Sequence, residues 1–246
     1  MDLNRKDDKA KPGGVSSLMK RPSISKRWLP AGLISLAVFL LITWLVIAGI
    51  TQGPDGQLAL FINNRSLGSI FGSLMILASV YGREYFWIPV VALMLLFGKR
   101  DTKVLAIELA ALFILGIIAG EAMKHLMFRA RPFETLTGQI ITRVPTDTDS
   151  SYPSGHALIV SIGAIFALTR FRKKSIALLL ALEAAVVCYS RVYVGMHYPL
   201  DVVSGIFLGS FIVFTGLFVL ERNFRKVVDG LTDLVQKVLR GGIFSI

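Results

Sequence analysis

The sequence predicts an all-α membrane protein, a bundle of six transmembrane helices with an interfacial helix between the first and second spans. Composition is the first observation behind this prediction. The chain has 246 residues, of which 54% are hydrophobic and 17% charged, and its mean hydropathy is +0.64, which is too apolar for a soluble domain of this size. Apolar runs separated by short basic segments are the second observation, since about 20 apolar residues cross a bilayer of about 30 Å.

Six apolar runs are the expected spans. They cover residues 29–50, 85–97, 104–128, 154–169, 175–193 and 200–220. Between the first two runs, Gly53-Pro54-Asp55-Gly56 indicates a turn, because glycine and proline are the residues that most often interrupt regular structure. Residues 57–80 have a mixed polar and apolar pattern, which favours an interfacial or re-entrant helix over a span.

Lysine and arginine positions favour six spans over seven. With six spans and both termini in the cytoplasm, 20 of the 27 basic residues lie on the cytoplasmic side, as the positive-inside rule requires. A seventh span over residues 67–81 would move the C-terminal tail to the opposite side and remove this bias.

The chain divides into one membrane domain, residues 28–220, and two polar ends. Residues 1–27 are rich in Lys, Ser, Gly and Pro, so we expect a disordered cytoplasmic tail without a cleaved signal peptide. In residues 221–246, apolar side chains recur at helical spacing, which predicts an amphipathic cytoplasmic tail on the membrane surface.

The formal charge of +11 does not indicate nucleic-acid binding, because the basic residues occur in short clusters between apolar segments. Cys188 is the one cysteine of the sequence, so an intrachain disulfide and a thiolate metal cluster are both excluded. No pattern in the sequence indicates an oligomeric state.

Two polar motifs lie at the ends of predicted spans. Lys124 and Arg131 are two helical turns apart at the end of the third span, before Pro132 stops the helix. Pro153-Ser154-Gly155-His156 opens the fourth span, where free backbone N–H groups and the helix dipole favour a phosphate.

A third motif follows the fifth span and reads Ser190-Arg191, then His197, then Asp201. Because His197 and Asp201 are four residues apart, a helical turn would let the carboxylate reach one imidazole nitrogen and leave the other free. By the parity of six spans, all three motifs lie on the outer face. Ionisable groups at a membrane are costly and are usually functional.

These three motifs resemble, without departure, the signature of the type 2 phosphatidic acid phosphatase family, which shares its site with vanadium haloperoxidases. Between Lys124 and Asp201 the resemblance rests on motifs, and the six-span layout extends it to most of the chain. Three gapped motifs in the correct order are specific, whereas Pro-Ser-Gly-His alone would be a weak signal.

The resemblance implies a role for each site residue. His197, oriented by Asp201, is expected to attack phosphorus and form a phosphohistidine, and His156 is expected to act as general acid and then as base. The implied phosphate ligands are Lys124, Arg131, Ser154, Gly155 and Arg191. Near these motifs we see no carboxylate cluster suited to a metal, so metal-independent hydrolysis without a cofactor is expected.

Several polar residues outside the motifs receive other interpretations. His125 would face away from Lys124 and is interpreted as structural, and Glu121 is expected to pair with Lys124 one turn away. Arg129 and Arg143 are interpreted as lipid headgroup contacts. The outer loop of residues 133–152, which contains Asp147 and Asp149, is expected to cap the headgroup.

A lipid phosphate in the bilayer is the expected partner, and an isoprenyl diphosphate such as undecaprenyl diphosphate is the preferred substrate. Phosphatidylglycerophosphate, phosphatidate and lipid A phosphates remain alternatives. A lipid phosphotransferase and a non-catalytic lipid-binding protein are the alternatives from other functional classes. We expect a multi-pass protein of the plasma membrane, with its active site on the extracytoplasmic face.

Overall fold

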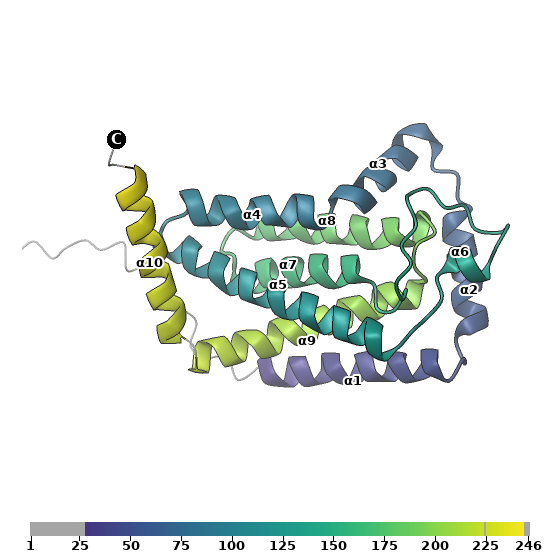
Figure 1. Cartoon of the computed structure of the whole chain (residues 1–246), viewed down its shortest axis with the longest axis horizontal. Coiled ribbons are helices and arrows are strands. Elements are labelled where there is room, and N and C mark those ends of the chain that lie inside the picture. Colours follow the sequence, from purple (N-terminus) through teal and green to yellow (C-terminus); the bar gives the residue numbers. More distant parts are fainter. Residues whose placement is uncertain (1–27, 224, 244–246) are drawn as a thin grey trace, which may run out of the picture.

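The computed structural model describes residues 28–223 and 225–243, and the regular elements within these residues are all helices (Figure 1). The expected N-terminal tail, residues 1–27, lies outside the described residues. The helices are α1 (Trp28–Ile47), α2 (Gln52–Asn63), α3 (Gly68–Tyr81), α4 (Glu84–Phe97), α5 (Arg100–Leu126), α6 (Pro132–Thr135), α7 (Gly155–Arg170), α8 (Lys174–Tyr193), α9 (Pro199–Asn223) and α10 (Arg225–Ile243).

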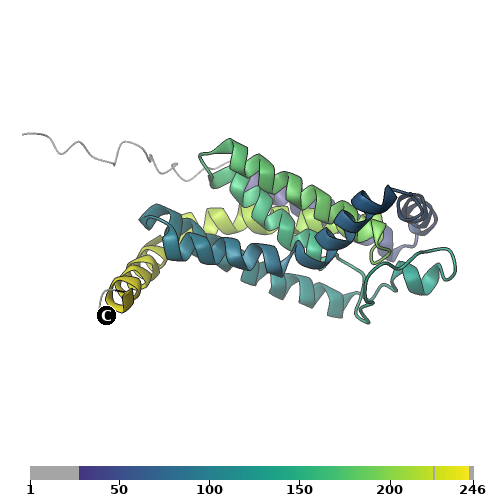
Figure 2. The ribbon, with the colours of Figure 1, turned by 90° about the horizontal axis from the view of Figure 1, so that it is seen from above.

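The long helices α1, α4, α5, α7, α8 and α9 run along one common direction, and two helices lie across the ends of this bundle (Figure 1). At one end is α2, beside α6 and the loop that follows it. At the other end is α10, and the view from above again places α2 and α10 at opposite ends (Figure 2). The start of α1 lies at the same end as α10.

Four helices are long and apolar enough to cross a membrane, namely α1, α5, α8 and residues 199–220 of α9. The helices α3 and α4 pass the same test only as a pair, and they are bent by 61° at their junction. With only 16 residues, α7 is about 24 Å long, which is shorter than the hydrocarbon core. Helix length therefore supports four or five crossings rather than the six expected from the sequence.

The segment between the first two predicted spans differs from the expectation in two ways. Gly53 to Gly56 do not form a turn, because they belong to the first part of α2. Pro54 is tolerated there, since the first backbone N–H groups of a helix have no partner within that helix. Residues 57–80 form two helices rather than one: α2 crosses the end of the bundle, and α3 continues into the bent pair with α4.

The core of the bundle is built around α7, which packs against α5, α8 and α9. Most of its side chains are buried, and those of Leu158, Val160, Ile162 and Phe166 are at most 1% exposed. Because neighbouring helices enclose α7, its short length does not leave polar backbone facing lipid.

Close packing of α9 on α7 brings the starts of these two helices together. A Cβ atom on Gly205 would lie only 2.7 Å from the carbonyl oxygen of Ser154, and one on Gly209 would lie 2.9 Å from that of Leu158. Glycine at both positions therefore permits the backbones to touch. This contact places His197, in the turn before α9, beside the first residues of α7.

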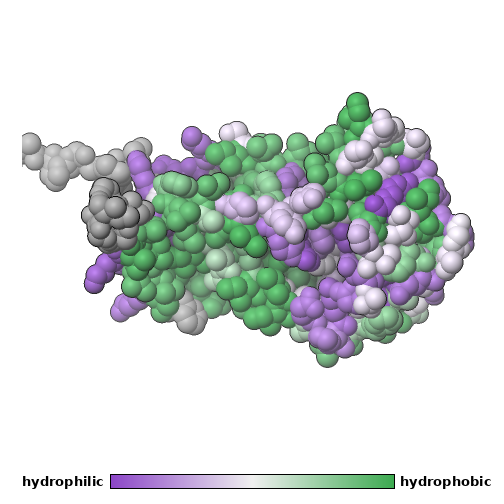
Figure 3. Space-filling model, turned by 45° about the horizontal axis from the view of Figure 1, so that its top comes forward, coloured by the Kyte–Doolittle hydropathy of each residue, from purple (hydrophilic) through white to green (hydrophobic). Residues whose placement is uncertain are grey.

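Apolar side chains cover much of the middle of the bundle, whereas polar side chains gather at the end that contains α2 and α6 (Figure 3). Exposed leucines and isoleucines on α1, α4, α5 and α8 contribute to this apolar surface. On α10, Val227, Leu231, Leu234 and Val238 are exposed at helical spacing, while Asp229 and Asp233 pair with Arg100 of α5. An amphipathic helix thus lies across the end opposite the polar one.

Candidate active site

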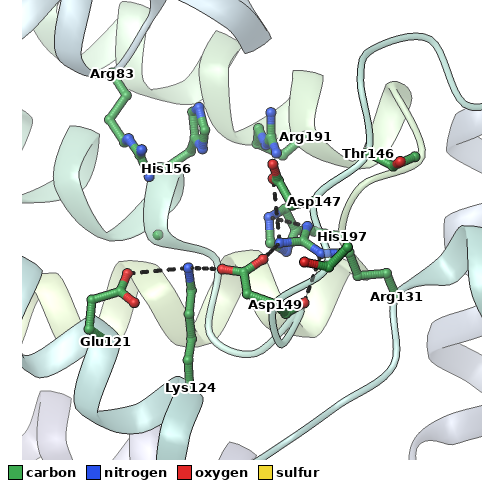
Figure 4. Close-up of a pocket in the computed structure, with 12 residues that line it drawn as sticks. Arg83, Glu121, Lys124, Arg131, Thr146, Asp147, Asp149, His156, Arg191 and His197 are labelled. Carbon is green, nitrogen blue, oxygen red and sulfur yellow. Dashed lines mark hydrogen bonds and ion pairs between the residues drawn. The ribbon is translucent and has the colours of Figure 1, made fainter.

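A polar cavity of about 550 Å³ lies at the end of the bundle near α2, where α5 and α8 end and α7 begins (Figure 4). Basic side chains dominate its lining. The lining residues are Arg83, Glu121, Lys124, Arg131, Thr146, Asp147, Thr148, Asp149, Gly155, His156, Arg191 and His197.

The start of α7 forms one wall of this cavity. Ser154 is the N-cap residue, and its Oγ accepts a hydrogen bond from the backbone N–H of Ala157 at 3.4 Å. The side chain of Ser154 is completely buried and is absent from the cavity lining, whereas Gly155 and His156 line it. Capping leaves the other free N–H groups of the first turn at the edge of the cavity.

His197 lies between α8 and α9, and its contacts define which ring nitrogen carries the proton. Its Nδ1 is 2.8 Å from the carbonyl oxygen of Ser151 and must donate, since a carbonyl can only accept. Its Nε2 is 3.4 Å from Nη1 of Arg131, a donor, so the lone pair is on Nε2. Burial, and then the charges of Arg191 and Arg131, hold the pKa of His197 well below its ordinary value of 6.5.

Asp201 lies behind His197, but it does not form the hydrogen bond expected from their spacing. Oδ2 of Asp201 is 3.7 Å from Nδ1 of His197, which is beyond hydrogen-bonding range. Its carboxylate instead accepts from Nη1 of Arg129 at 2.5 Å and from the backbone N–H of Tyr198 at 2.9 Å. The proton on Nδ1 is therefore held by the carbonyl of Ser151.

A buried charge network extends from Asp201 to α2. The second guanidinium nitrogen of Arg129 is 2.7 Å from Oδ2 of Asp55, and Oδ1 of Asp55 accepts from the backbone N–H of Leu200 at 3.0 Å. Asp55 and Asp201 are both at most 4% exposed. Arg129 therefore joins α2 to the first turn of α9, and it is not the headgroup contact that the sequence suggested.

Arg143 also differs from the expected headgroup contact. It donates to the backbone carbonyl of Tyr193 at 2.7 Å and to that of Asn63 at 2.8 Å, and its guanidinium lies over the ring of Tyr193. The side chain of Asn63 in turn bonds to both Tyr193 and Ile141. Arg143 and Asn63 thus fix the loop of residues 133–152 to the end of α8.

Asp149 bridges two of the predicted phosphate ligands (Figure 4). Its Oδ2 is 2.5 Å from Nζ of Lys124, and its Oδ1 is 2.5 Å from Nη2 of Arg131. Although burial raises the pKa of Asp149, the hydrogen bonds and charges of Lys124 and Arg131 outweigh it and lower that pKa to about 2. A phosphate that binds both cations would therefore compete with this carboxylate.

Arg191 enters the cavity from α8 and is supported by α3. Its Nη1 donates to Oγ of Ser79 at 2.7 Å, and both residues are buried. Glu121 pairs with Lys124 at 3.4 Å, as the spacing of the two residues predicted. His125 is exposed and does not line the cavity.

An apolar groove of about 480 Å³ adjoins the polar cavity and follows α4, α5 and α7. Its lining includes Trp87, Phe113 and Leu158, together with the exposed side chains of Ile114 and Ile117. Arg83, Glu121, Lys124 and Gly155 line both the groove and the polar cavity. The two spaces therefore meet at these residues.

Within residues 28–223 and 225–243, no group of three or more His, Cys, Asp and Glu side chains has an arrangement that could bind a metal ion. The polar cavity instead brings cations together. Its donor set therefore suits an anionic group.

A sequence profile of the PAP2 superfamily matches residues 105–225, which include all three motifs. An undecaprenyl-diphosphatase of Sulfolobus acidocaldarius is 44% identical over 184 residues, which are 74% of this chain and 87% of that protein. The chain belongs to the PAP2 superfamily. Undecaprenyl-diphosphatase BcrC of Bacillus subtilis is a more distant relative of this PAP2 phosphatase, 28% identical over 69% of this chain and 83% of its own.

Two solved structures share the fold of this multi-pass membrane protein. A phosphatidylglycerolphosphate phosphatase of the PAP2 type from Bacillus subtilis superposes with a TM-score of 0.64 and 20% identity, over 80% of this chain and 96% of its own. LpxE from Aquifex aeolicus superposes with a TM-score of 0.57 and 25% identity, over 65% of this chain and 93% of its own.

The PAP2 cavity includes six of the eight site residues expected from the sequence, and Ser154 and Asp201 lie directly behind it. Arg83 and the Asp55–Arg129 pair were missed. Arg83 belongs to no motif, and only its position at a break between two apolar runs could have drawn attention to it. Asp55 was hidden within an apparent turn.

Proposed function

We propose that this PAP2 phosphatase removes the terminal phosphate of a (poly)prenyl diphosphate through a phosphohistidine intermediate. The proposal rests on one observation above all: a cavity with two imidazoles and several cations opens into an apolar groove. A lipid phosphate has the matching chemistry, an anionic head on an apolar chain. The names of the relatives from Sulfolobus acidocaldarius and Bacillus subtilis favour a prenyl diphosphate.

In the first step, Nε2 of His197 attacks the terminal phosphorus in line with the bridging oxygen. A phosphorus–nitrogen bond forms as the bond to the bridging oxygen breaks, and His156 gives its proton to the departing lipid phosphate. The hydrogen bond from Nδ1 to Ser151 keeps the lone pair on Nε2. Asp201, 3.7 Å away, offsets the positive charge that develops on the ring.

In the second step, His156 takes a proton from water, and the water oxygen attacks the phosphohistidine. The phosphorus–nitrogen bond breaks, its electron pair returns to Nε2, and orthophosphate leaves. His156 therefore ends the cycle protonated, as it began. Its place in the cavity lining, across from His197, suits both proton transfers (Figure 4).

Fixed positive charge supplies the remaining stabilisation. Lys124, Arg131 and Arg191, together with the N-terminus of α7 at Gly155, bind the phosphoryl oxygens on which transition-state charge develops. Ser154 contributes by capping that helix rather than through its own hydroxyl. We infer that these groups replace a metal ion, so that hydrolysis is metal-independent.

For the topology we propose six crossings, made by α1, the bent pair of α3 and α4, α5, α7, α8 and α9. The short helix α7 can cross because protein surrounds most of it. The polar cavity then lies on the extracytoplasmic face of the plasma membrane. The cytoplasmic side holds α10, within the amphipathic segment 221–246, and the tail of residues 1–27.

Other substrates and functions make different predictions. Phosphatidylglycerophosphate, phosphatidate and lipid A phosphates share the phosphate chemistry, and one of the superposed structures is named as a phosphatidylglycerolphosphate phosphatase. A phosphotransferase would need an acceptor, whereas a hydrolase releases orthophosphate without one. A lipid-binding protein without catalysis would release none.

The test is orthophosphate release in detergent with EDTA, measured for prenyl diphosphates, phosphatidylglycerophosphate and phosphatidate in parallel. His197→Ala should lower release from a prenyl diphosphate by at least about 1,000-fold, since loss of a covalent nucleophile removes the whole pathway. His125→Ala is the matched control, because this exposed histidine lies outside the cavity. Full activity of His197→Ala, or a strict metal requirement, would refute the mechanism.

A further inference from the structure

Arg83 belongs to none of the three motifs, yet it lines both the polar cavity and the apolar groove. It is the N-cap residue of α4, at the junction with α3 where the chain bends by 61°. The bend turns its side chain into the cavity, toward His156 (Figure 4). The guanidinium of Arg83 therefore reaches the cavity from the side opposite Arg131 (Figure 4).

The two ends of the Arg83 guanidinium have different surroundings. Its Nη2 pairs with Glu84, which is about half exposed at the edge of the groove. Its Nη1 faces Gly155, because a Cβ atom built there would lie 3.3 Å from Nη1. Its Nε is buried without a hydrogen-bond partner among the described side chains and backbone. Nη1, which faces Gly155 in the cavity lining, is therefore the guanidinium nitrogen placed to donate to a ligand.

Gly155 separates Arg83 from Lys124 at the start of α7. The same Cβ atom would lie 3.9 Å from Nζ of Lys124, so any larger residue would occupy the space between the two cations. Backbone N–H groups at the start of a helix add a partial positive charge to that space. Two cations and a helix N-terminus thus surround one small gap.

This gap lies where the groove meets the cavity, since Arg83, Lys124 and Gly155 line both. A lipid whose chain lies in the groove would pass its head through the gap before reaching His197. Among the residues that line both spaces, Glu121 is the acidic one, and it pairs with Lys124. Lys124 also pairs with Asp149, and Arg83 pairs with Glu84, so a phosphate in the gap would compete with these carboxylates.

We propose that Arg83 binds the lipid-proximal phosphate of a diphosphate substrate at the gap beside Lys124 and Gly155, so that Arg83 selects diphosphate over monophosphate lipids. This inference rests on the proposed function and extends it. The terminal phosphate lies at His197, held by Lys124 and the other cations of the proposed mechanism, and the proximal phosphate lies nearer the groove, beside Arg83. It stays on the lipid when the bridging bond breaks. A monophosphate lipid at His197 has no group for Arg83 to bind.

The test compares Arg83→Gln with the wild type on farnesyl diphosphate and farnesyl monophosphate, which carry the same chain. We expect kcat/KM for the diphosphate to fall about 10- to 100-fold, the range of a lost charge-assisted hydrogen bond, and kcat/KM for the monophosphate to change less than about threefold. Arg65→Gln is the control, because this exposed arginine stacks on Phe61 outside the cavity. Equal losses on both substrates, or no loss on either, would overturn the inference.

A binding measurement separates selectivity from misfolding. Methylenebisphosphonate, a diphosphate that cannot be cleaved at its bridge, should inhibit Arg83→Gln about 10-fold less than the wild type, while inhibition by vanadate stays the same. Loss of inhibition by both compounds would indicate a damaged site. Arg83→Lys then replaces Arg83→Gln in the test, and because it keeps the positive charge it should retain more of the preference for the diphosphate. A wild type that releases no phosphate from either lipid would refute the proposed function instead.

Discussion

At the scale of single residues, the site is defined by hydrogen bonds to backbone atoms as much as by the motif side chains. Nδ1 of His197 donates a hydrogen bond to the carbonyl of Ser151, and Arg131 donates to the carbonyl of Met196 at 3.0 Å. These contacts fix a neutral imidazole with its lone pair toward the cavity. Buried cations around it disfavour a second proton on the ring.

The pH dependence of kcat/KM should report this neutral state. Because the pKa of His197 lies below 6.5, the imidazole stays unprotonated as the pH falls through that value. The loss of kcat/KM that is caused by protonation of His197 should therefore occur below pH 6.5. Arg131→Gln removes one nearby charge and should move this loss to higher pH while lowering the rate.

Substrate ionisation is identical for both proteins, so the difference between the two pH profiles reports the enzyme alone. A profile of Arg131→Gln that coincides in shape with the wild-type profile would show that the arginine does not influence the imidazole. Rates from pH 5 to 9, measured at substrate concentrations well below KM, provide the comparison.

The spacing rule failed at His197 and Asp201 for a physical reason. Residues four apart meet only within a helix, and α9 begins at Pro199, after His197. The partner that replaces Asp201 is a backbone carbonyl of Ser151, and sequence patterns carry no information about such acceptors. The motifs nevertheless identified the cavity, because six of their eight predicted site residues line it.

At the scale of elements, α2 acts as a clamp across the end of the bundle. Asp55 holds Arg129 and the first turn of α9, and Asn63 holds the loop of residues 133–152 and the end of α8. Read alone, Gly53-Pro54-Asp55-Gly56 has turn composition, and only the buried partners of Asp55 explain why a helix begins there. Tertiary contacts of this kind could not be predicted from local sequence.

Removing the Asp55 charge should therefore destabilise the fold. Asp55→Asn leaves Arg129 paired with Asp201 but weakens its buried, charge-assisted hydrogen bond to α2, and loss of such a bond costs about 1.5–3 kcal/mol. Thermal unfolding in detergent should show a clearly lower Tm than the wild type. Asp233→Asn, which breaks an exposed pair with Arg100, should leave Tm nearly unchanged. Equal Tm values for Asp55→Asn and the wild type would contradict the clamp.

At the scale of the whole molecule, the polar site and the amphipathic α10 lie at opposite ends of an apolar bundle (Figures 1 and 3). Apolar runs predicted this membrane bundle well, because hydrocarbon thickness imposes a minimum length on exposed helices. They also located α4 and α7 to within one residue, but neither helix is long enough to cross by itself, since a helix bent against a neighbour or enclosed by protein need not have that length.

Cysteine labelling tests the proposed orientation. In a Cys188→Ala background, Thr137→Cys places a thiol on the exposed loop at the site end, and Lys237→Cys places one on α10. A membrane-impermeant maleimide should label the first in intact cells and the second only after permeabilisation. The reverse pattern would invert the topology and place the site in the cytoplasm.

The groove along α4, α5 and α7 has exposed isoleucines in its lining, so in the proposed membrane orientation a lipid can enter it sideways from the bilayer. A substrate that arrives this way diffuses in two dimensions and never leaves the bilayer. The rate then depends on the mole fraction of the substrate among the surrounding lipids and detergents, and not on its bulk concentration. Added detergent acts on such an enzyme as a diluent, although the solution concentration of the substrate has not changed.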